Sequence, residues 1–139
     1  MDCGHGFNSF VFEFKTGRTG GDVLHLGMGV KNQLEQHAWY NKNAQSKAHP
    51  VGTKSPNPFG LHDMLGNVWE WVEDCYVENY DGAPNDGTAR TSGDCGLRVV
   101  RGGSWLSEPQ NLRVANRYRN ARDVRYSDVG FRVARTLGP

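Results

Sequence analysis

Several carboxylates lie close together in residues 60–76, GLHDMLGNVWEWVEDCY, where they alternate with two tryptophans. Glu70, Glu73 and Asp74 are near neighbours there, and Asp94 follows further along the chain. Carboxylate pairs act as general acid and as nucleophile or base in glycoside hydrolysis, at a separation that sets the reaction's outcome. These residues are therefore candidate catalytic groups of a hydrolase, although the sequence does not give their separation in space.

The three cysteines, Cys3, Cys75 and Cys95, match no zinc motif, because no C-x-x-C pair occurs. Cys75 and Cys95 could pair across the loop between them, or they could stay thiols in a reducing cytosol. The N-terminus lacks the basic and apolar regions of a secretory signal, so a cytoplasmic location is slightly favoured. No run of about 18 apolar residues occurs, so no membrane-spanning helix is expected.

Charge is distributed unevenly along the chain, although its net value is only +1. Residues 60–96 hold eight acids and one basic residue, Arg90, whereas residues 97–139 hold nine arginines and three acids. The favoured interpretation is that the two regions pack together and neutralise each other. An arginine-rich face for nucleic acid is the alternative. It is less favoured, and no nucleic-acid partner is expected, because lysine is absent from that region and phosphate-binding faces usually carry both residues.

The chain is expected to form a single α+β domain, residues 1–139, with short strands and long loops. Eighteen glycines and a hydrophobic content of 37% favour such a loop-rich fold over a helical bundle. The expected elements are strands at 10–14, 68–73, 97–105 and 129–137, a short helix or turn at 31–41, and irregular segments at 46–60, 77–96 and 107–128.

Three blocks carry a family resemblance: residues 49–76, residues 97–105 (LRVVRGGSW) and residues 129–135 (VGFRVAR). In this order and at this spacing they resemble the C-terminal half of the formylglycine-generating enzyme, or sulfatase-modifying factor, family. The resemblance covers residues 38–137, whereas residues 1–30 do not resemble the usual N-terminal half. It implies the family's variant of the C-type lectin fold.

The resemblance also implies one calcium site. The family's segment around GNVWEW wraps a calcium ion, and the matching positions are Asp63, Gly66, Val68 and Glu70. Calcium takes six to eight oxygen ligands from carboxylates and backbone carbonyls, which these positions can supply. The alternative is that the two acids pair with arginines. Since the tryptophans flank Glu70, we expect one in the core and the other at the surface or in a cleft.

Cysteine-oxidase activity is not expected. The family's oxidases use two cysteines after the RGGS motif to bind copper and activate oxygen. The matching positions here are Ser107 and Leu112, which cannot replace thiolates as copper ligands. Copper is therefore not expected either.

The resemblance places substrate binding on residues 105–128, so the chain is expected to be a calcium-stabilised binding domain for a small molecule, glycan or peptide. Such a domain could form a homo-oligomer. The same region also resembles the variable proteins of diversity-generating retroelements, which is an alternative function beside the hydrolase. The candidate ligand-binding residues are Trp105, Ser107, Arg113, Arg117, Tyr118 and Tyr126. Plausible variable positions are Leu106, Ser107, Glu108, Val114, Tyr118, Val124, Tyr126, Ser127 and Asp128.

Overall fold

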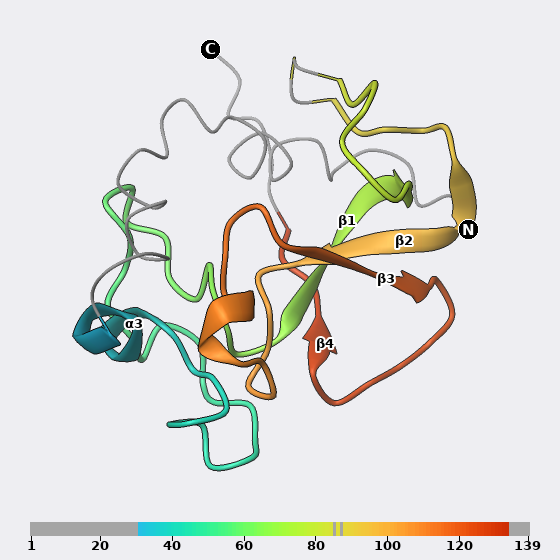
Figure 1. The fold of residues 1–139 in the computed structure, drawn as a ribbon. Coiled ribbons are helices and arrows are strands. Elements are labelled where there is room, and N and C mark those ends of the chain that lie inside the picture. Colours follow the sequence, from blue (N-terminus) through green and yellow to red (C-terminus); the bar gives the residue numbers. More distant parts are fainter. Residues whose placement is uncertain (1–30, 85, 87, 134–139) are drawn as a thin grey trace.

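The computed structural model describes residues 31–84, 86 and 88–133, and confirms an α+β arrangement of short elements and long loops (Figure 1). The strand expected at 10–14 lies outside these residues. None of the described helices is long and apolar enough to cross a membrane. The elements in chain order are α3 (Lys31–His37), β1 (Trp69–Tyr76), β2 (Asp94–Arg101), a 3₁₀ helix (Pro109–Asn111), β3 (Arg117–Ala121) and β4 (Val129–Gly130).

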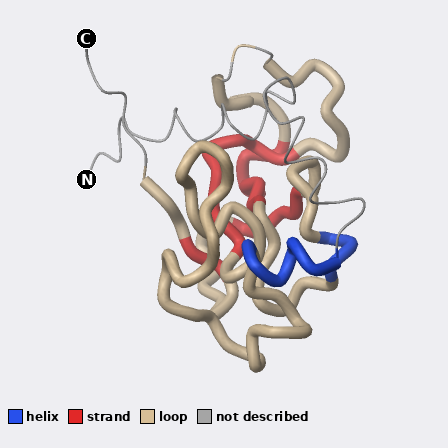
Figure 2. Tube along the Cα trace, turned by 90° about the vertical axis from the view of Figure 1, so that its left-hand side faces the viewer, coloured by secondary structure: helices blue, strands red, loops and turns tan. Residues whose placement is uncertain are grey.

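The four strands form one sheet in the order β3-β2-β1-β4, with α3 and the loops packed around it (Figure 2). β2 runs antiparallel to both β1 and β3, whereas β4 runs parallel to β1. The register aligns Glu70 with Arg101 and Arg101 with Arg117. Residues far apart in the sequence therefore share one row across the sheet.

Two expected segments differ from the structure. The region expected to be irregular at 107–128 contains β3, because Arg117–Ala121 pairs with β2 although its sequence, RYRNA, lacks alternating apolar residues. Tertiary pairing therefore overrides the local pattern. The strand expected at 129–137 is only Val129–Gly130 within the described residues, which end at residue 133.

β1 buries two of its acidic side chains more completely than its tryptophans. Glu70, Val72 and Asp74 are buried, while Trp69 and Trp71 are both half-buried. The expectation of one core and one surface tryptophan is wrong, because residues two apart in a strand share a face and experience a similar environment. Register shifts after Trp71 mark an irregularity in the pairing with β2.

Among the described residues, buried apolar side chains form two small clusters. One joins α3 to the loops through Leu34, Ala38, Tyr40, Leu65 and Leu112. The other lies on the sheet and consists of Val72 and Val99, with Tyr76 packed against them. Cys75 and Cys95 form a disulfide between β1 and β2, the first of the two alternatives that the sequence left open.

Candidate functional site

The guanidinium of Arg132 contacts the carboxylate of Glu70 and the backbone of Asp63 at the start of β1. Arg132 donates to Glu70 Oε1 from Nη2 at 2.7 Å and from Nε at 3.0 Å, and a longer contact of 3.2 Å reaches Oε2. Its Nη2 also donates to the backbone oxygen of Asp63 at 3.2 Å. Both acids are almost completely buried, at 6% and 7% exposure. The pairing with arginine expected as an alternative to calcium is therefore present at Glu70.

Asp63 has unused capacity to bind a cation. Its Oδ2 accepts the backbone N–H of Gly52 at 2.7 Å, but its buried Oδ1 has no hydrogen-bond partner among the described residues. Its backbone is also left-handed, with φ of 56°. Buried polar atoms are nearly always satisfied, so an unsatisfied carboxylate oxygen favours an additional positive group at this point.

The Gly-Asn pair before β1 holds the loops of this region together. Gly66 has φ of 77°, and a Cβ there would lie 2.2 Å from the backbone oxygen of Trp39. Asn67 accepts the N–H of His49 through Oδ1 and donates to its carbonyl through Nδ2. The glycine is required for close backbone approach, and the asparagine fixes the neighbouring loop.

Burial raises the pKa of Glu70, Arg132 opposes that rise and the charge of Asp63 adds to it. The donors fit calcium in kind: Asp63 Oδ1, the less engaged Glu70 Oε2, and the carbonyls of Gly66 and Val68. Arg132 neutralises one of the two carboxylates, so the region keeps a single formal negative charge. The described residues contain no cluster of three or more His, Cys, Asp or Glu side chains, so binding would depend on carbonyl ligands.

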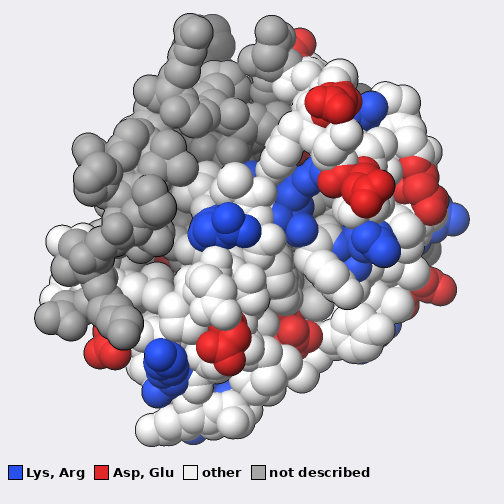
Figure 3. Space-filling model, in the orientation of Figure 1, with Lys and Arg blue, Asp and Glu red and all other residues white. Residues whose placement is uncertain are grey.

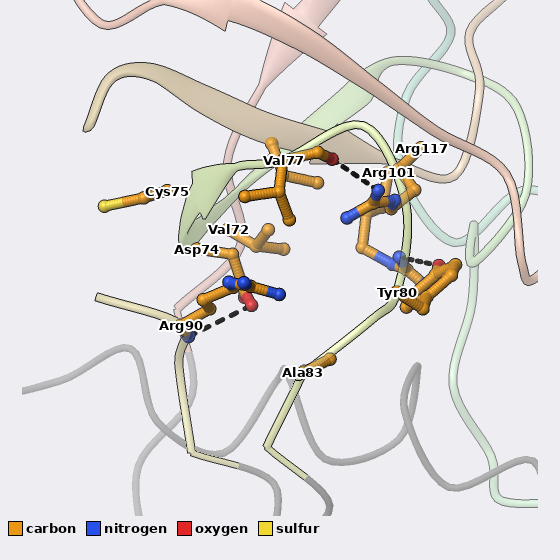
Figure 4. Close-up of a pocket in the computed structure, with 10 residues that line it drawn as sticks. Val72, Asp74, Cys75, Val77, Tyr80, Ala83, Arg90, Arg101 and Arg117 are labelled. Carbon is orange, nitrogen blue, oxygen red and sulfur yellow. Dashed lines mark hydrogen bonds between the residues drawn. The ribbon is translucent and has the colours of Figure 1, made fainter. Parts of the chain in front are cut away.

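A second polar region lies further along the same face of β1, where three arginines line a cavity of about 20 Å³ (Figure 4). This is sufficient for roughly one water molecule. The cavity lies between the sheet and the loop that follows β1. Its lining residues are Val72, Asp74, Cys75, Val77, Tyr80, Ala83, Val99 and the three arginines Arg90, Arg101 and Arg117.

Arg90 reaches the cavity from the loop and is anchored at both ends. Its backbone N–H donates to Asp74 Oδ1 at 3.1 Å, and its Nη1 donates to the carbonyl of Asp81 at 2.6 Å. The Nε of Arg90 is buried and has no hydrogen-bond partner among the described residues. The cavity therefore contains an unused charged donor.

Arg101 and Arg117 enter the cavity from β2 and β3. Arg101 donates to the hydroxyl of Tyr80 at 2.9 Å and to the carbonyl of Val114 at 2.8 Å. Arg117 donates to the carbonyl of Val77 at 2.5 Å and lies 4.3 Å above the ring of Tyr80. The acceptors of these bonds are carbonyls and a tyrosine hydroxyl. The Glu70–Arg132 contact is a pairing of the kind expected between the acidic and basic regions.

Sequence reasoning placed Arg117 among the ligand-binding residues but missed Arg90, Arg101 and Tyr80. Arg90 carried a signal, because it is the single basic residue in an acidic stretch. Arg101 and Tyr80 had no such signal in the sequence. They meet only because of the strand register and because the loop after β1 folds back over the sheet.

The other predicted ligand-binding residues do not line this cavity. Tyr118 and Tyr126 are 58% and 56% exposed, and the ring of Tyr118 lies 6.2 Å from that of Trp69. Arg113 is exposed, while Trp105 is half-buried. The face of β1 opposite the cavity therefore presents an aromatic pair, with arginine and tyrosine exposed elsewhere in the segment. On the face shown in Figure 3, basic and acidic side chains are interspersed rather than segregated.

Ser107 and Leu112, which the family resemblance matches to the two cysteine positions, lie close to Gly103. A Cβ on Gly103 would lie 2.4 Å from Leu112 Cδ2 and 3.2 Å from Ser107 Oγ. Ser107 is buried, and its Oγ accepts the backbone N–H of Ser104. The two positions are thus brought together, but they present a hydroxyl and an alkyl group.

The candidate catalytic carboxylates are not gathered in one place. Glu70 is held by Arg132, Asp74 lines the cavity, and Glu73 is exposed between them. Asp94 is exposed at the start of β2. Of these four carboxylates, Asp74 alone lines the cavity.

Two curated proteins are similar to parts of this chain in sequence. The serine/threonine-protein kinase pkn1 of Chlamydia caviae is 41% identical over 92 residues, which cover 65% of this chain and 15% of that protein. The formylglycine-generating enzyme of Streptomyces coelicolor is 33% identical over 121 residues, which cover 82% of this chain and 38% of the enzyme. The chain thus spans less than half of the length of either relative.

Solved structures share the fold. Treponema denticola variable protein 1 superposes with a TM-score of 0.67 at 39% identity, covering 77% of this chain and 38% of that one. PvdO from Pseudomonas aeruginosa superposes with a TM-score of 0.70 at 41% identity, covering 79% and 43%. The fold is therefore the expected C-type-lectin-like fold of the formylglycine-generating-enzyme type.

Residues 13–137 match the family model described as the sulfatase-modifying factor enzyme 1-like domain. The match begins before residue 38, so it includes part of the 1–30 segment that was not expected to resemble the family. It covers most of the chain and agrees with the family resemblance found in the three sequence blocks. The chain belongs to the sulfatase-modifying factor enzyme 1-like domain family.

Proposed function

We propose that this chain is a calcium-stabilised binding domain on a formylglycine-generating-enzyme-like scaffold, without cysteine-oxidase activity. The observation that carries the proposal is the pair Ser107 and Leu112, which meet at Gly103 where the family resemblance implies two cysteines. Neither side chain can donate a thiolate to copper or undergo thiol oxidation. A scaffold that keeps its fold without these groups is suited to binding.

Calcium would be held by Asp63, Gly66, Val68 and Glu70. When bound, it would supply positive charge to two buried carboxylates, of which only that of Glu70 is in contact with Arg132, and so tie the 60–68 loop to β1. The unsatisfied Oδ1 of Asp63 supports this assignment. So does the raised pKa of Glu70, since Asp63 adds to the cost of keeping both acids ionised.

The ligand would be a small molecule, glycan or peptide that contacts the exposed part of residues 105–128. Tyr118 beside Trp69, and Tyr126, offer ring faces for stacking, and Arg113 offers a charged donor. A second candidate function is that of a variable binding protein, which the similarity to Treponema denticola variable protein 1 favours. Both candidates use the same exposed tyrosines.

The calcium part is tested by thermal unfolding with calcium and with a chelator. Because calcium would bind only the folded state, the unfolding free energy should rise by about 2.7 kcal/mol at a concentration 100 times the dissociation constant. Asp63→Asn and Glu70→Gln should remove the rise, while Glu73→Gln, at an exposed position of the same strand, should retain it. A rise of equal size in all four proteins would contradict the assignment.

The expected lack of cysteine-oxidase activity is tested by incubating the chain with a cysteine-containing peptide and copper. We expect no conversion to formylglycine, and formation of formylglycine would overturn the proposal.

The exposed side chains of Phe131 and Val133 beside β4 support contact with a second copy or another chain, which a concentration-dependent mass in solution would reveal.

A further inference from the structure

We propose that the cavity formed by Arg90, Arg101 and Arg117 binds a carboxylate group, at a site distinct from the exposed 105–128 surface. This inference goes beyond the proposed function and does not depend on calcium. Arg117 points into the cavity, whereas its neighbour Tyr118 lies against Trp69 on the opposite face of the sheet. Successive residues of a strand face opposite ways, so the two sites are separated by the sheet.

The charge of the lining favours an anion. Among the described lining residues, three arginines accompany one carboxylate, that of Asp74, whose Oδ1 accepts the N–H of Arg90. Arg117 is held over Tyr80, so its fork is fixed in orientation. The buried Nε of Arg90 still has a hydrogen to donate. An anion placed here gains charge-assisted hydrogen bonds from donors that are already ordered.

The size and the remaining lining narrow the class of anion. The enclosed space of about 20 Å³ holds little more than one water molecule, so only the head group of a small anion could enter it. Four of the lining residues, Val72, Val77, Ala83 and Val99, are aliphatic. The planar fork of arginine matches a planar carboxylate. A carboxylate with a short aliphatic part therefore fits better than phosphate, which is bulkier and has no apolar surface. The group could belong to a small free acid or to the C-terminus of a peptide.

The test is a titration of the full 139-residue chain in chelator, followed by the arginine Nε–H signals in ¹H–¹⁵N NMR spectra. The probes are propionate, inorganic phosphate and chloride at matched ionic strength. We expect saturable shifts with propionate and only weak, unsaturated shifts with the other two. Equal responses to all three would show general screening and would overturn the proposal.

Variants locate the site. Arg90→Gln should weaken propionate binding about tenfold, and Arg117→Lys several-fold, because lysine keeps the charge but loses the fork. Arg122→Gln, at an exposed arginine outside the cavity, should bind like the wild type. If Arg90→Gln does not fold, Arg117→Lys still decides the question. Equal affinity in Arg117→Lys and Arg122→Gln would overturn the proposal.

A final pair of probes separates the two sources of the carboxylate. An acetylated dipeptide with a free C-terminus should bind more tightly than propionate if the site reads peptide ends, and its amide should not bind. Binding of propionate with no gain from the dipeptide assigns the site to a small free acid. Because calcium is absent, failure of the calcium proposal would not change either result.

Discussion

The two ends of the buried face of β1 carry the same kinds of residue in opposite proportion. At one end, Arg132 donates to the carboxylate of Glu70 and to the backbone oxygen of Asp63. At the other end, four residues along the strand, Asp74 lines a cavity together with three arginines. Among the described residues, the first end has more carboxylates and favours a cation, whereas the second has more arginines and favours an anion.

This difference is set by what reaches the strand from elsewhere. Arg132 follows β4, Arg117 belongs to β3 and Arg90 lies in the loop after β1. Their charges act at short range, because opposite charges near a protein surface interact by about 4 kcal/mol at 4 Å separation. Two sites of opposite preference can therefore lie on one strand, provided that each receives a different set of arginines.

The largest effect should come from breaking the Glu70 end through its backbone. In Gly66→Ala the new Cβ would lie 2.2 Å from the carbonyl oxygen of Trp39, at a φ of 77°. We expect a loss of roughly 4 kcal/mol of unfolding free energy, because the backbone around β1 must shift. Gly60→Ala is the matched control: its φ is 78° but its Cβ would meet no atom within 4 Å, so it should lose only about 1 kcal/mol. Urea unfolding of both variants measures the difference, and similar losses would show that the contact with Trp39 is unimportant.

Breaking the Asp74 end should cost nearly as much. The Cys75–Cys95 disulfide joins β1 to β2 beside the cavity, across a sequence separation of 20 residues. A loop of this length predicts a loss of roughly 3 kcal/mol on reduction. Urea unfolding with and without reductant, compared with a Cys75→Ser, Cys95→Ser double variant, measures it. An unchanged midpoint would mean that the disulfide is not formed in solution. Its presence would favour an oxidising compartment over the cytoplasmic location expected from the sequence.

The pH dependence of calcium binding should test whether the Glu70 end of β1 binds a cation through the ionised carboxylate. Burial raises the pKa of Glu70 above 4.5. A raised pKa in the folded state stabilises the protein below the unfolded value, and this contribution is lost as pH rises through the folded value. Calcium requires the ionised form, so its stabilisation should weaken by up to about 1.4 kcal/mol per pH unit below the folded pKa.

Thermal unfolding with calcium and with chelator, at several values from pH 7 to 4, measures this dependence. Glu70→Gln should show no calcium effect at any of these values. A calcium effect in the wild type that does not change down to pH 4, below the ordinary carboxyl value, would remove Glu70 from the proposed ligands.

The sequence predicts the strand and the fold that support these sites better than the side chains that meet in them. The strand around Glu70 was found from its alternation, and the fold from the three blocks that carry the family resemblance. The positions Ser107 and Leu112 were assigned by their distance from the RGGS motif, and the structure brings them together at Gly103. Local pattern and motif spacing are properties of the chain itself, so they can be read directly.

The cavity could not be predicted, because it depends on contacts between distant segments. β3 was expected to be irregular, and only its pairing with β2 aligns Arg117 with Arg101. Tyr80 belongs to a loop without a sequence pattern, yet its hydroxyl accepts from Arg101. Such contacts follow from strand register and loop return, neither of which has a signature in composition or periodicity.

The smallest effect should be the most specific. Asp74→Asn removes the one carboxylate among the described lining residues but keeps an oxygen that can accept the N–H of Arg90. We expect a several-fold gain in propionate affinity, about 1 kcal/mol of binding free energy, because a like charge no longer opposes the ligand.

Glu73→Gln is the matched control, since it removes the same charge from the adjacent, exposed position of β1. It should leave propionate affinity nearly unchanged, because exposed charges are screened by solvent and salt. If both variants gained equally, net charge rather than the geometry of the cavity would set the affinity, and the contrast between the two ends of β1 would have no bearing on binding.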